Sequence, residues 1–106
     1  MDHKTVEDYL LSMPEAKLDY PFGENTAVYK VNDKMFALVS EKSDPLQLSL
    51  KCDPLLAETL RQKYDTVMPG YHLNKKHWNT IVLTGQLSWD EVKDLINHSY
   101  NLVASS

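Results

Sequence analysis

The chain has 106 residues and a mass of 12.2 kDa, which is the size of one domain. Hydrophobic residues make up 42% of it and charged residues 25%, values typical of globular proteins that exclude a disordered chain. There are 15 acidic and 11 basic residues, and the resulting net charge of -4 excludes a strongly basic nucleic-acid binder but not a local basic patch.

Targeting and redox signals are sparse. No apolar run approaches the roughly 18 residues that a membrane helix needs, and residues 1–4 lead into no signal-peptide stretch. The single cysteine, Cys52, excludes a disulfide framework and a zinc site built on cysteine pairs. We therefore expect a cytoplasmic protein with no membrane partner, and we expect it to be a monomer.

Apolar periodicity predicts three helices and four strands. In chain order these are a helix over residues 5–13, strands over 26–31, 34–40 and 46–52, a helix over 54–65, a strand over 78–84 and a helix that begins after Ser88. This order predicts an α+β fold, an antiparallel sheet with helices packed on one face. No linker or repeat divides the chain, so residues 1–106 are expected to form a single domain.

Turn and cap residues delimit these elements. Asn32-Asp33 suits a two-residue hairpin turn, because both residue types tolerate positive φ angles. Residues 68–71, Met-Pro-Gly-Tyr, predict a type II turn in which Gly70 supplies the positive φ angle. Ser88 followed by Glu91 predicts a capping box at the start of the last helix.

Strict pairing across the Asn32-Asp33 turn assigns the two faces of the hairpin. The face expected to lie under the helices holds Tyr29, Val31, Phe36 and Leu38, and the open face holds Val28, Lys30, Met35, Ala37 and Val39. The alternating strand over residues 46–52 turns its leucines and Cys52 inward and Lys51 outward. Lys30 and Lys51 are therefore expected to share the open face.

Residues that could support catalysis or metal binding have simpler explanations. His72 and His77 flank two lysines whose positive charge opposes a metal ion, and Cys52 continues an inward-facing leucine row. Paired carboxylates such as Asp90 and Glu91 lie in first helical turns, where capping and the helix dipole explain them. We expect no enzyme activity, no metal site and no cofactor.

Basic residues near aromatic and polar ones are the remaining candidate. A cluster over residues 75–79 adjoins the fourth predicted strand, Lys30 and Lys51 lie on strands, and Lys34 lies at the hairpin tip. One interpretation is that these lysines cover a solvated sheet face while Trp78 belongs to the core. The other is a basic stripe that contacts phosphates, with His77 or Asn79 adding hydrogen bonds.

Several strings resemble the MmcQ/YjbR-like family. They are Tyr-Pro-Phe-Gly at 20–23, Val-Tyr-Lys-Val at 28–31, Lys-Met-Phe-Ala at 34–37, Leu-Lys-Cys-Asp-Pro at 50–54, Pro-Gly-Tyr-His-Leu-Asn-Lys-Lys-His-Trp-Asn at 69–79 and Ser-Tyr at 99–100. The resemblance implies a CyaY- or frataxin-like double-wing arrangement, and DNA binding in small cytoplasmic bacterial proteins. By position, the residues of this chain that match the family pattern include Lys30, Lys34, Lys51, Lys75, Lys76, His77, Trp78 and Asn79.

The first hypothesis is therefore a non-enzymatic protein that binds double-stranded DNA weakly and without sequence preference. Its candidate nucleic-acid-binding residues are Lys30, Lys34, Lys51, Lys75, Lys76, His77 and Asn79. The alternative is a protein-interaction module that uses the same surface. A third possibility, frataxin-like metal handling, would need an exposed acidic ridge, for which Asp2, Glu7, Asp8 and Glu15 are the candidates.

Overall fold

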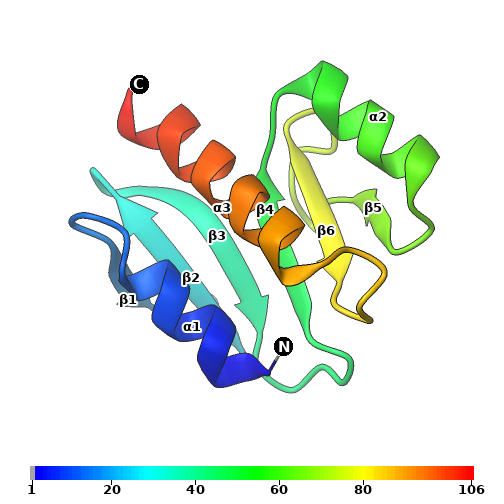
Figure 1. The fold of residues 1–106 in the computed structure, drawn as a ribbon. Helices are drawn as coiled ribbons and strands as arrows, with labels where there is room; N and C mark the ends of the chain where they lie inside the picture. The colour runs from blue at the N-terminus through cyan, green and yellow to red at the C-terminus, as the bar shows by residue number, and fades with distance from the viewer. Residues whose placement is uncertain (1) are drawn as a thin grey trace.

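Six antiparallel strands form one open sheet in the computed structural model, which describes residues 2–106 (Figure 1). Their order is β1 (Lys17–Asp19), β2 (Thr26–Val31), β3 (Lys34–Ser40), β4 (Gln47–Lys51), β6 (Trp78–Val82) and β5 (Val67–Pro69). The helices are α1 (His3–Leu11), α2 (Pro54–Lys63) and α3 (Trp89–Ala104). All three pack against one face of the sheet, so the predicted α+β architecture is confirmed.

The predicted elements are present, with small differences in their limits. The β2–β3 hairpin has the predicted limits, and its turn residues Asn32 and Asp33 have φ angles of 53° and 62°. The two edge strands β1 and β5 were not predicted, because three residues are too few for a period-two pattern to be recognised. No helix within residues 2–106 is long and apolar enough to cross a membrane.

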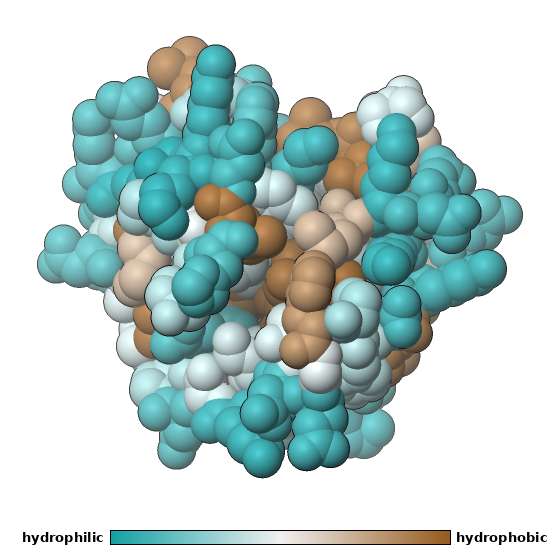
Figure 2. Space-filling model, turned by 180° about the vertical axis from the view of Figure 1, so that it is seen from behind, coloured by the Kyte–Doolittle hydropathy of each residue, from teal (hydrophilic) through white to brown (hydrophobic). Residues whose placement is uncertain are grey.

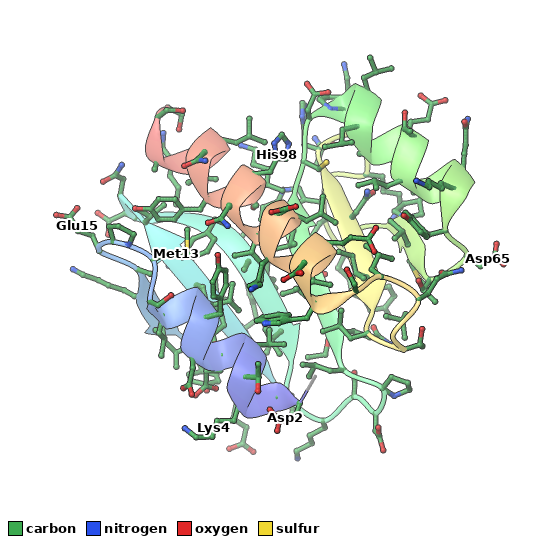
Figure 3. All side chains as sticks on the ribbon, in the orientation of Figure 1. Asp2, Lys4, Met13, Glu15, Asp65 and His98 are labelled. Atoms are coloured by element: carbon green, nitrogen blue, oxygen red, sulfur yellow. The ribbon has the colours of Figure 1, made fainter. Side chains whose placement is uncertain are left out.

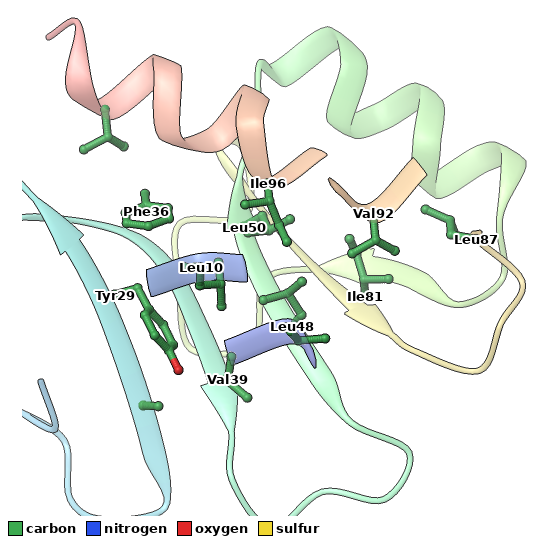
Figure 4. Packing of buried hydrophobic residues seen from close by; sticks show 14 of the residues in the cluster. Leu10, Tyr29, Phe36, Val39, Leu48, Leu50, Ile81, Leu87, Val92 and Ile96 are labelled. Carbon is green, nitrogen blue, oxygen red and sulfur yellow. The ribbon is translucent and has the colours of Figure 1, made fainter. Parts of the chain in front are cut away.

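The main core lies between the sheet and the helices (Figure 4). Leu10 of α1 and Ile96 of α3 are fully buried, as are Tyr29, Phe36 and Leu48 beneath them. Burial of each large side chain of this kind stabilises the fold by about 1.5–3 kcal/mol. Helix α3 crosses the middle of the sheet over β3 and β4 and therefore covers most of this core (Figure 1).

A bulge in β3 corrects the predicted faces of the hairpin. Tyr29 pairs with Ala37 but Lys30 pairs with Met35, so Phe36 is an extra residue on β3. Phe36 and Ala37 both enter the main core, and the alternation beyond them is reversed. The placement of Tyr29, Val31 and Phe36 under the helices is confirmed; the placement of Leu38, Ala37 and Val39 was wrong because strict alternation assumes no bulge.

A second, smaller cluster lies on the face without helices. Val28, Leu38 and Trp78 form it, with Met35 and Leu73 packed against them. Trp78 is only 7% exposed, so the expectation that it belongs to the core or its rim is confirmed. Leu73 comes from the loop between β5 and β6, which this cluster holds against the sheet.

Gly70 has a different role from the one predicted. Its φ angle is not in the left-handed region; the residue with the positive φ angle is His72, at 58°. The turn spans residues 70–73 and is closed by the Leu73 N–H, which donates to the Gly70 carbonyl over 3.3 Å. A glycine is required at position 70 because a Cβ atom there would lie 2.7 Å from the Cβ of Trp78.

Helix α3 begins with the predicted capping box. The Glu91 N–H donates to Ser88 Oγ over 3.1 Å, and the Ser88 N–H donates to Glu91 Oε1 over 3.0 Å. The backbone N–H of Ser88, followed by the Tyr64 hydroxyl, lowers the pKa of Glu91. The stabilisation that this gives is present above the ordinary Glu pKa of about 4.3 and is lost as the pH falls through the lowered value.

Replacing Ser88 with alanine should lower the free energy of unfolding by about 0.5–2 kcal/mol, because the first turn of α3 loses an acceptor for a backbone N–H. Urea denaturation measures this change. Ser105→Ala, at the opposite end of the same helix, is the control and should change the midpoint less. An unchanged midpoint for Ser88→Ala would contradict the role of the cap.

Trp78→Ala should cost about 3–5 kcal/mol, because it removes the largest side chain of the cluster on the helix-free face. Leu55→Ala is the control, since Leu55 is 75% exposed and its loss should change stability by less than about 0.5 kcal/mol. Thermal melting of both variants compares them. Equal melting temperatures would contradict the burial of Trp78.

Candidate nucleic-acid interface

The helix-free face is the surface on which the predicted basic residues were expected to meet (Figure 2). Antiparallel partners point to the same side of a sheet, so the register assigns its strand residues. They are Lys17, Asp19, Thr26, Val28, Lys30, Met35, Leu38, Ser40, Gln47, Ser49, Lys51, Met68, Trp78, Thr80 and Val82. Asp19 is the one carboxylate among them.

Three lysines form a row across one end of this face. Lys17 pairs with Lys30 across β1 and β2, and Lys51 lies on β4 beside Trp78. Between them β3 contributes Met35. With strands about 4.8 Å apart, the row spans about 14 Å. We call Lys17, Lys30 and Lys51 the lysine row.

Lys30 is the one member of the lysine row that forms an ion pair within residues 2–106, and Glu15 and Asp33 line a hollow together with Lys17 and Lys30. Lys30 Nζ lies 3.5 Å from Asp19 Oδ2, and the Lys30 side chain is 28% exposed. An exposed pair of this kind contributes at most about 1 kcal/mol, so Lys30 can exchange its partner for a phosphate. Lys17 and Lys51 form no ion pair within residues 2–106.

The loop between β5 and β6 places the other predicted cations beside Trp78. Lys75 Nζ donates to the Gly70 carbonyl over 3.1 Å, and Arg61 of α2 donates to the Lys75 carbonyl over 3.0 Å. Lys76 is exposed, whereas His77 is half-buried and its carbonyl accepts the Cys52 N–H over 2.8 Å. The loop is therefore attached to the rest of the protein through its backbone, which leaves Lys76 in solvent.

Two predicted site residues lie on the other side of the sheet. Lys34 pairs with the inward-facing Val31, and its Nζ donates to Ser106 Oγ over 3.2 Å, near the end of α3. Asn79 is 2% exposed, and its Nδ2 donates to the Ala57 carbonyl of α2 over 3.2 Å. The structure therefore places neither of these predicted residues on the helix-free face: Lys34 faces the helices, and Asn79 joins α2 to the sheet.

A groove of about 270 Å³ lies on the same face, away from the lysine row. Its floor is formed by Leu38 and by polar strand residues, and two loops form its walls. The lining residues are Phe22, Thr26, Leu38, Ser40, Gln47, Ser49, Tyr71, His72, Leu73 and Thr80. The hydroxyls of Ser49 and Thr80 are 2.8 Å apart, and the Tyr71 N–H donates to Thr80 Oγ1 over 3.2 Å. We call this cavity the open-face groove.

The walls of the open-face groove carry residues that the sequence analysis did not assign to a site. Phe22 is 63% exposed and Tyr71 is 70% exposed, which is unusual for large aromatic side chains. The sequence held one signal that could have indicated the exposure of Phe22 and Tyr71. Both residues lie in Pro- and Gly-containing turns, where side chains tend to remain in solvent. Lys17 was missed because β1 was not predicted.

Cys52 is not placed as a nucleophile. The residue is 3% exposed, and burial, followed by the charge of Asp53, raises the pKa of its thiol to about 11. A thiol with this pKa is almost entirely protonated at neutral pH, and a protonated thiol does not attack electrophiles.

The acidic residues near α1 are engaged in local pairs. Asp2 caps α1 by accepting the Thr5 N–H over 2.8 Å, and Asp8 lies 3.3 Å from Lys4. His3 pairs with Glu41 and lies 3.9 Å from Glu7. His3, Glu7 and Glu41 are the one group within residues 2–106 whose ligand atoms lie close enough together to hold a metal ion. These residues are half-buried and do not form the exposed acidic ridge that metal handling was expected to need.

Comparison with known proteins identifies the family of this chain. The family model of YjbR matches residues 11–102. The chain belongs to the YjbR family. Its relatives include the uncharacterised protein YbdF of Escherichia coli O157:H7, 39% identical over 101 residues that cover 95% of this chain and 83% of YbdF. YjbR of E. coli K12 is 38% identical over 92 residues, covering 87% of this chain and 78% of that protein.

Solved structures of YjbR relatives share the fold. The crystal structure of Deinococcus radiodurans protein DR2400 superposes with a TM-score of 0.92 at 38% identity, covering 97% of this chain and 78% of that one. A Pseudomonas syringae protein gives a TM-score of 0.83 at 33% identity and covers 97% and 99% of the two chains. The six-stranded sheet with three helices is thus the fold of these relatives.

Alkylation can test the state of Cys52. At pH 8 iodoacetamide should react with the native protein at least about tenfold more slowly than with the protein in urea, because the native thiol is buried and protonated. The thiol is counted by mass spectrometry over time. Equal rates in the native and unfolded protein would show that the thiol is accessible and ionised.

Proposed function

We propose that this protein binds nucleic acid through its helix-free sheet face, without catalysing a reaction. Phosphates would lie along the lysine row and near Lys76, so the contacts would be electrostatic and independent of base sequence. The observation that carries the proposal is the lysine row itself: three cations across one end of a face whose strands hold a single carboxylate.

The distribution of charge supports the proposal in spite of the net charge of -4. The other carboxylates belong to helices, caps and loops, for example Glu7 and Asp8 on α1 and Asp90, Glu91 and Asp94 on α3. Glu15 and Asp65 project outward at opposite sides of the molecule (Figure 3). Two of the loop carboxylates, Glu15 and Asp33, line one hollow together with Asp19, Lys17 and Lys30, so the charge at the β1 end of the lysine row is mixed. Charges more than about 10 Å away are largely screened at 0.1 M salt.

The cations on the strands of this face are lysines, and this argues against sequence-specific recognition of bases. Bidentate arginine contacts to guanine are the commonest base-specific contact, and lysine acts as a point charge. The single arginine, Arg61, is occupied on α2, where it donates to the carbonyls of Ala57 and Lys75. We expect a dissociation constant no better than about 10 μM near physiological salt.

A protein partner is the second candidate for this face, and the exposed rings of Phe22 and Tyr71 favour it. Exposed aromatic side chains are typical of residues that dominate the binding energy of protein interfaces. A protein partner that buries these rings would not require the lysine row, and this difference separates the two functions.

The test of the proposal is the salt dependence of DNA binding, measured by fluorescence anisotropy with a labelled duplex. The slope of the logarithm of the binding constant against the logarithm of salt concentration becomes shallower by about 0.9 for each phosphate that the protein no longer neutralises. The double variant Lys17→Ala/Lys51→Ala should therefore reduce the steepness of the slope by about 1.8.

A matched control keeps the change in net charge the same. The double variant Lys4→Ala/Lys63→Ala removes two lysines from α1 and α2, on the helix-covered side, and Lys4 projects outward from α1 (Figure 3). Its slope should equal that of the parent protein. No binding by the parent at low salt to either a duplex or a single strand, or equal slopes for the two double variants, would overturn the proposal and favour a protein partner.

A further inference from the structure

The open-face groove carries a more specific inference about the ligand. It lies on the same face as the lysine row. The floor of the groove begins at Leu38 and Ser49, which are the next residues along their strands, beyond the lysine row, that point to this face. Alternate residues on a strand are about 7 Å apart, so a nucleotide with its phosphate at Lys51 has its base within reach of the groove.

The walls of the groove offer flat aromatic surfaces. Phe22 comes from the loop between β1 and β2, and Tyr71 comes from the loop between β5 and β6. The two rings therefore reach the groove from loops at opposite edges of the sheet. They are 63% and 70% exposed. Exposed rings beside a cationic row are the combination by which proteins bind unpaired bases, because a base stacks on the ring while its phosphate meets the lysine.

The turn that presents Tyr71 is held in an uncommon conformation. His72 has a φ angle of 58°, which is uncommon outside glycine, and its ring lies 4.0 Å from the Tyr71 ring between centroids. The Tyr71 N–H donates to Thr80 on the sheet, and Gly70 lies directly against Trp78. Backbone strain that the surrounding contacts maintain is concentrated at ligand sites, and here it orients two rings over the groove.

The floor of the groove offers hydrogen-bonding groups. Ser40 and Gln47 pair across β3 and β4 and bring a hydroxyl and a carboxamide to the groove, and Ser49 adds a second hydroxyl, which is positioned by its hydrogen bond with the buried Thr80. Hydroxyls and carboxamides both donate and accept, so they can meet the edge of any base. This set has no charge, which suits a base and not a second phosphate.

We infer that the open-face groove takes an unpaired base, so that the ligand of this face is single-stranded nucleic acid and not a duplex. The inference rests on the proposed function and names its substrate class. In a duplex the faces of the bases are covered by stacking, and Phe22 and Tyr71 would have nothing to stack on. A single strand exposes those faces and can place bases in the groove while its backbone follows the lysine row.

The experiment compares a labelled single strand of about 16 nucleotides with the duplex of the same sequence, at one low salt concentration. The parent protein should bind the single strand at least about fivefold more tightly than the duplex. Tyr71→Ala should weaken single-strand binding at least about fivefold, since stacking of one base contributes about 1–3 kcal/mol, and should leave duplex binding unchanged.

Two further variants serve as controls. Tyr71→Phe keeps the ring and should restore single-strand binding to within about twofold of the parent. Leu55→Ala removes an exposed apolar side chain of α2, which does not line the groove, and should change neither affinity. Tyr71 is exposed, so the variants should melt like the parent, and this is checked first.

The outcomes separate the inference from the proposed function. If the parent binds the duplex as tightly as the single strand, or if Tyr71→Ala leaves single-strand binding unchanged, the inference is overturned while the proposed function stands. If the parent binds neither probe at low salt, the proposed function fails and the inference falls with it.

Discussion

The bulge at Phe36 is the constraint on which both faces of the sheet depend. The extra residue lets Phe36 and Ala37 both enter the main core, where the Phe36 carbonyl accepts a hydrogen bond from Ser99 of α3. It also reverses the strand beyond that point, so Leu38 emerges on the helix-free face. Without that reversal Trp78 would lack its central apolar neighbour, and the loop between β5 and β6 would lack the surface against which Leu73 packs. The bulge thereby creates the apolar surface against which the loop that carries Tyr71 packs.

A close contact between the backbone of Gly70 and Trp78 also holds this loop on the sheet. Gly70 lies so near Trp78 that a Cβ atom would collide with it, and its N–H donates to the Trp78 carbonyl over 2.9 Å. His72 takes the positive φ angle inside the turn, and the Lys75 side chain donates to the Gly70 carbonyl. These contacts hold the base of the loop against the sheet while its aromatic and basic side chains remain in solvent. A pre-organised surface of this kind lowers the entropy cost of binding.

The two faces of the sheet differ in chemistry as well as in packing. On the helix-covered face the Asn79 Nδ2 donates to a carbonyl of α2 and Cys52 is protonated and buried, whereas the buried Tyr29 hydroxyl and Asn79 Oδ1 have no hydrogen-bond partner among the described residues. On the helix-free face, hydrophobic residues lie in the middle and hydrophilic residues surround them (Figure 2). The groove on this face contains hydroxyls and an amide, and the lysine row lies along one end. Acidic residues concentrate on the helices and loops, where caps and ion pairs use several of them. A net acidic protein can therefore carry a locally basic surface.

Local signals in the sequence determined the fold class, the hairpin turn at Asn32-Asp33, the capping box at Ser88 and the burial of Cys52, because each depends on residues close in the chain. They also placed Lys30 and Lys51 on one face, since alternation holds on both sides of the bulge. Only the tertiary structure decided that Lys34 and Asn79 face the helices, that Lys17 joins the lysine row, and that Phe22 and Tyr71 border one groove. These facts depend on a one-residue bulge, on two three-residue edge strands and on loops that meet across the sheet. Such features arise from pairing between distant segments, which no local period in the sequence encodes.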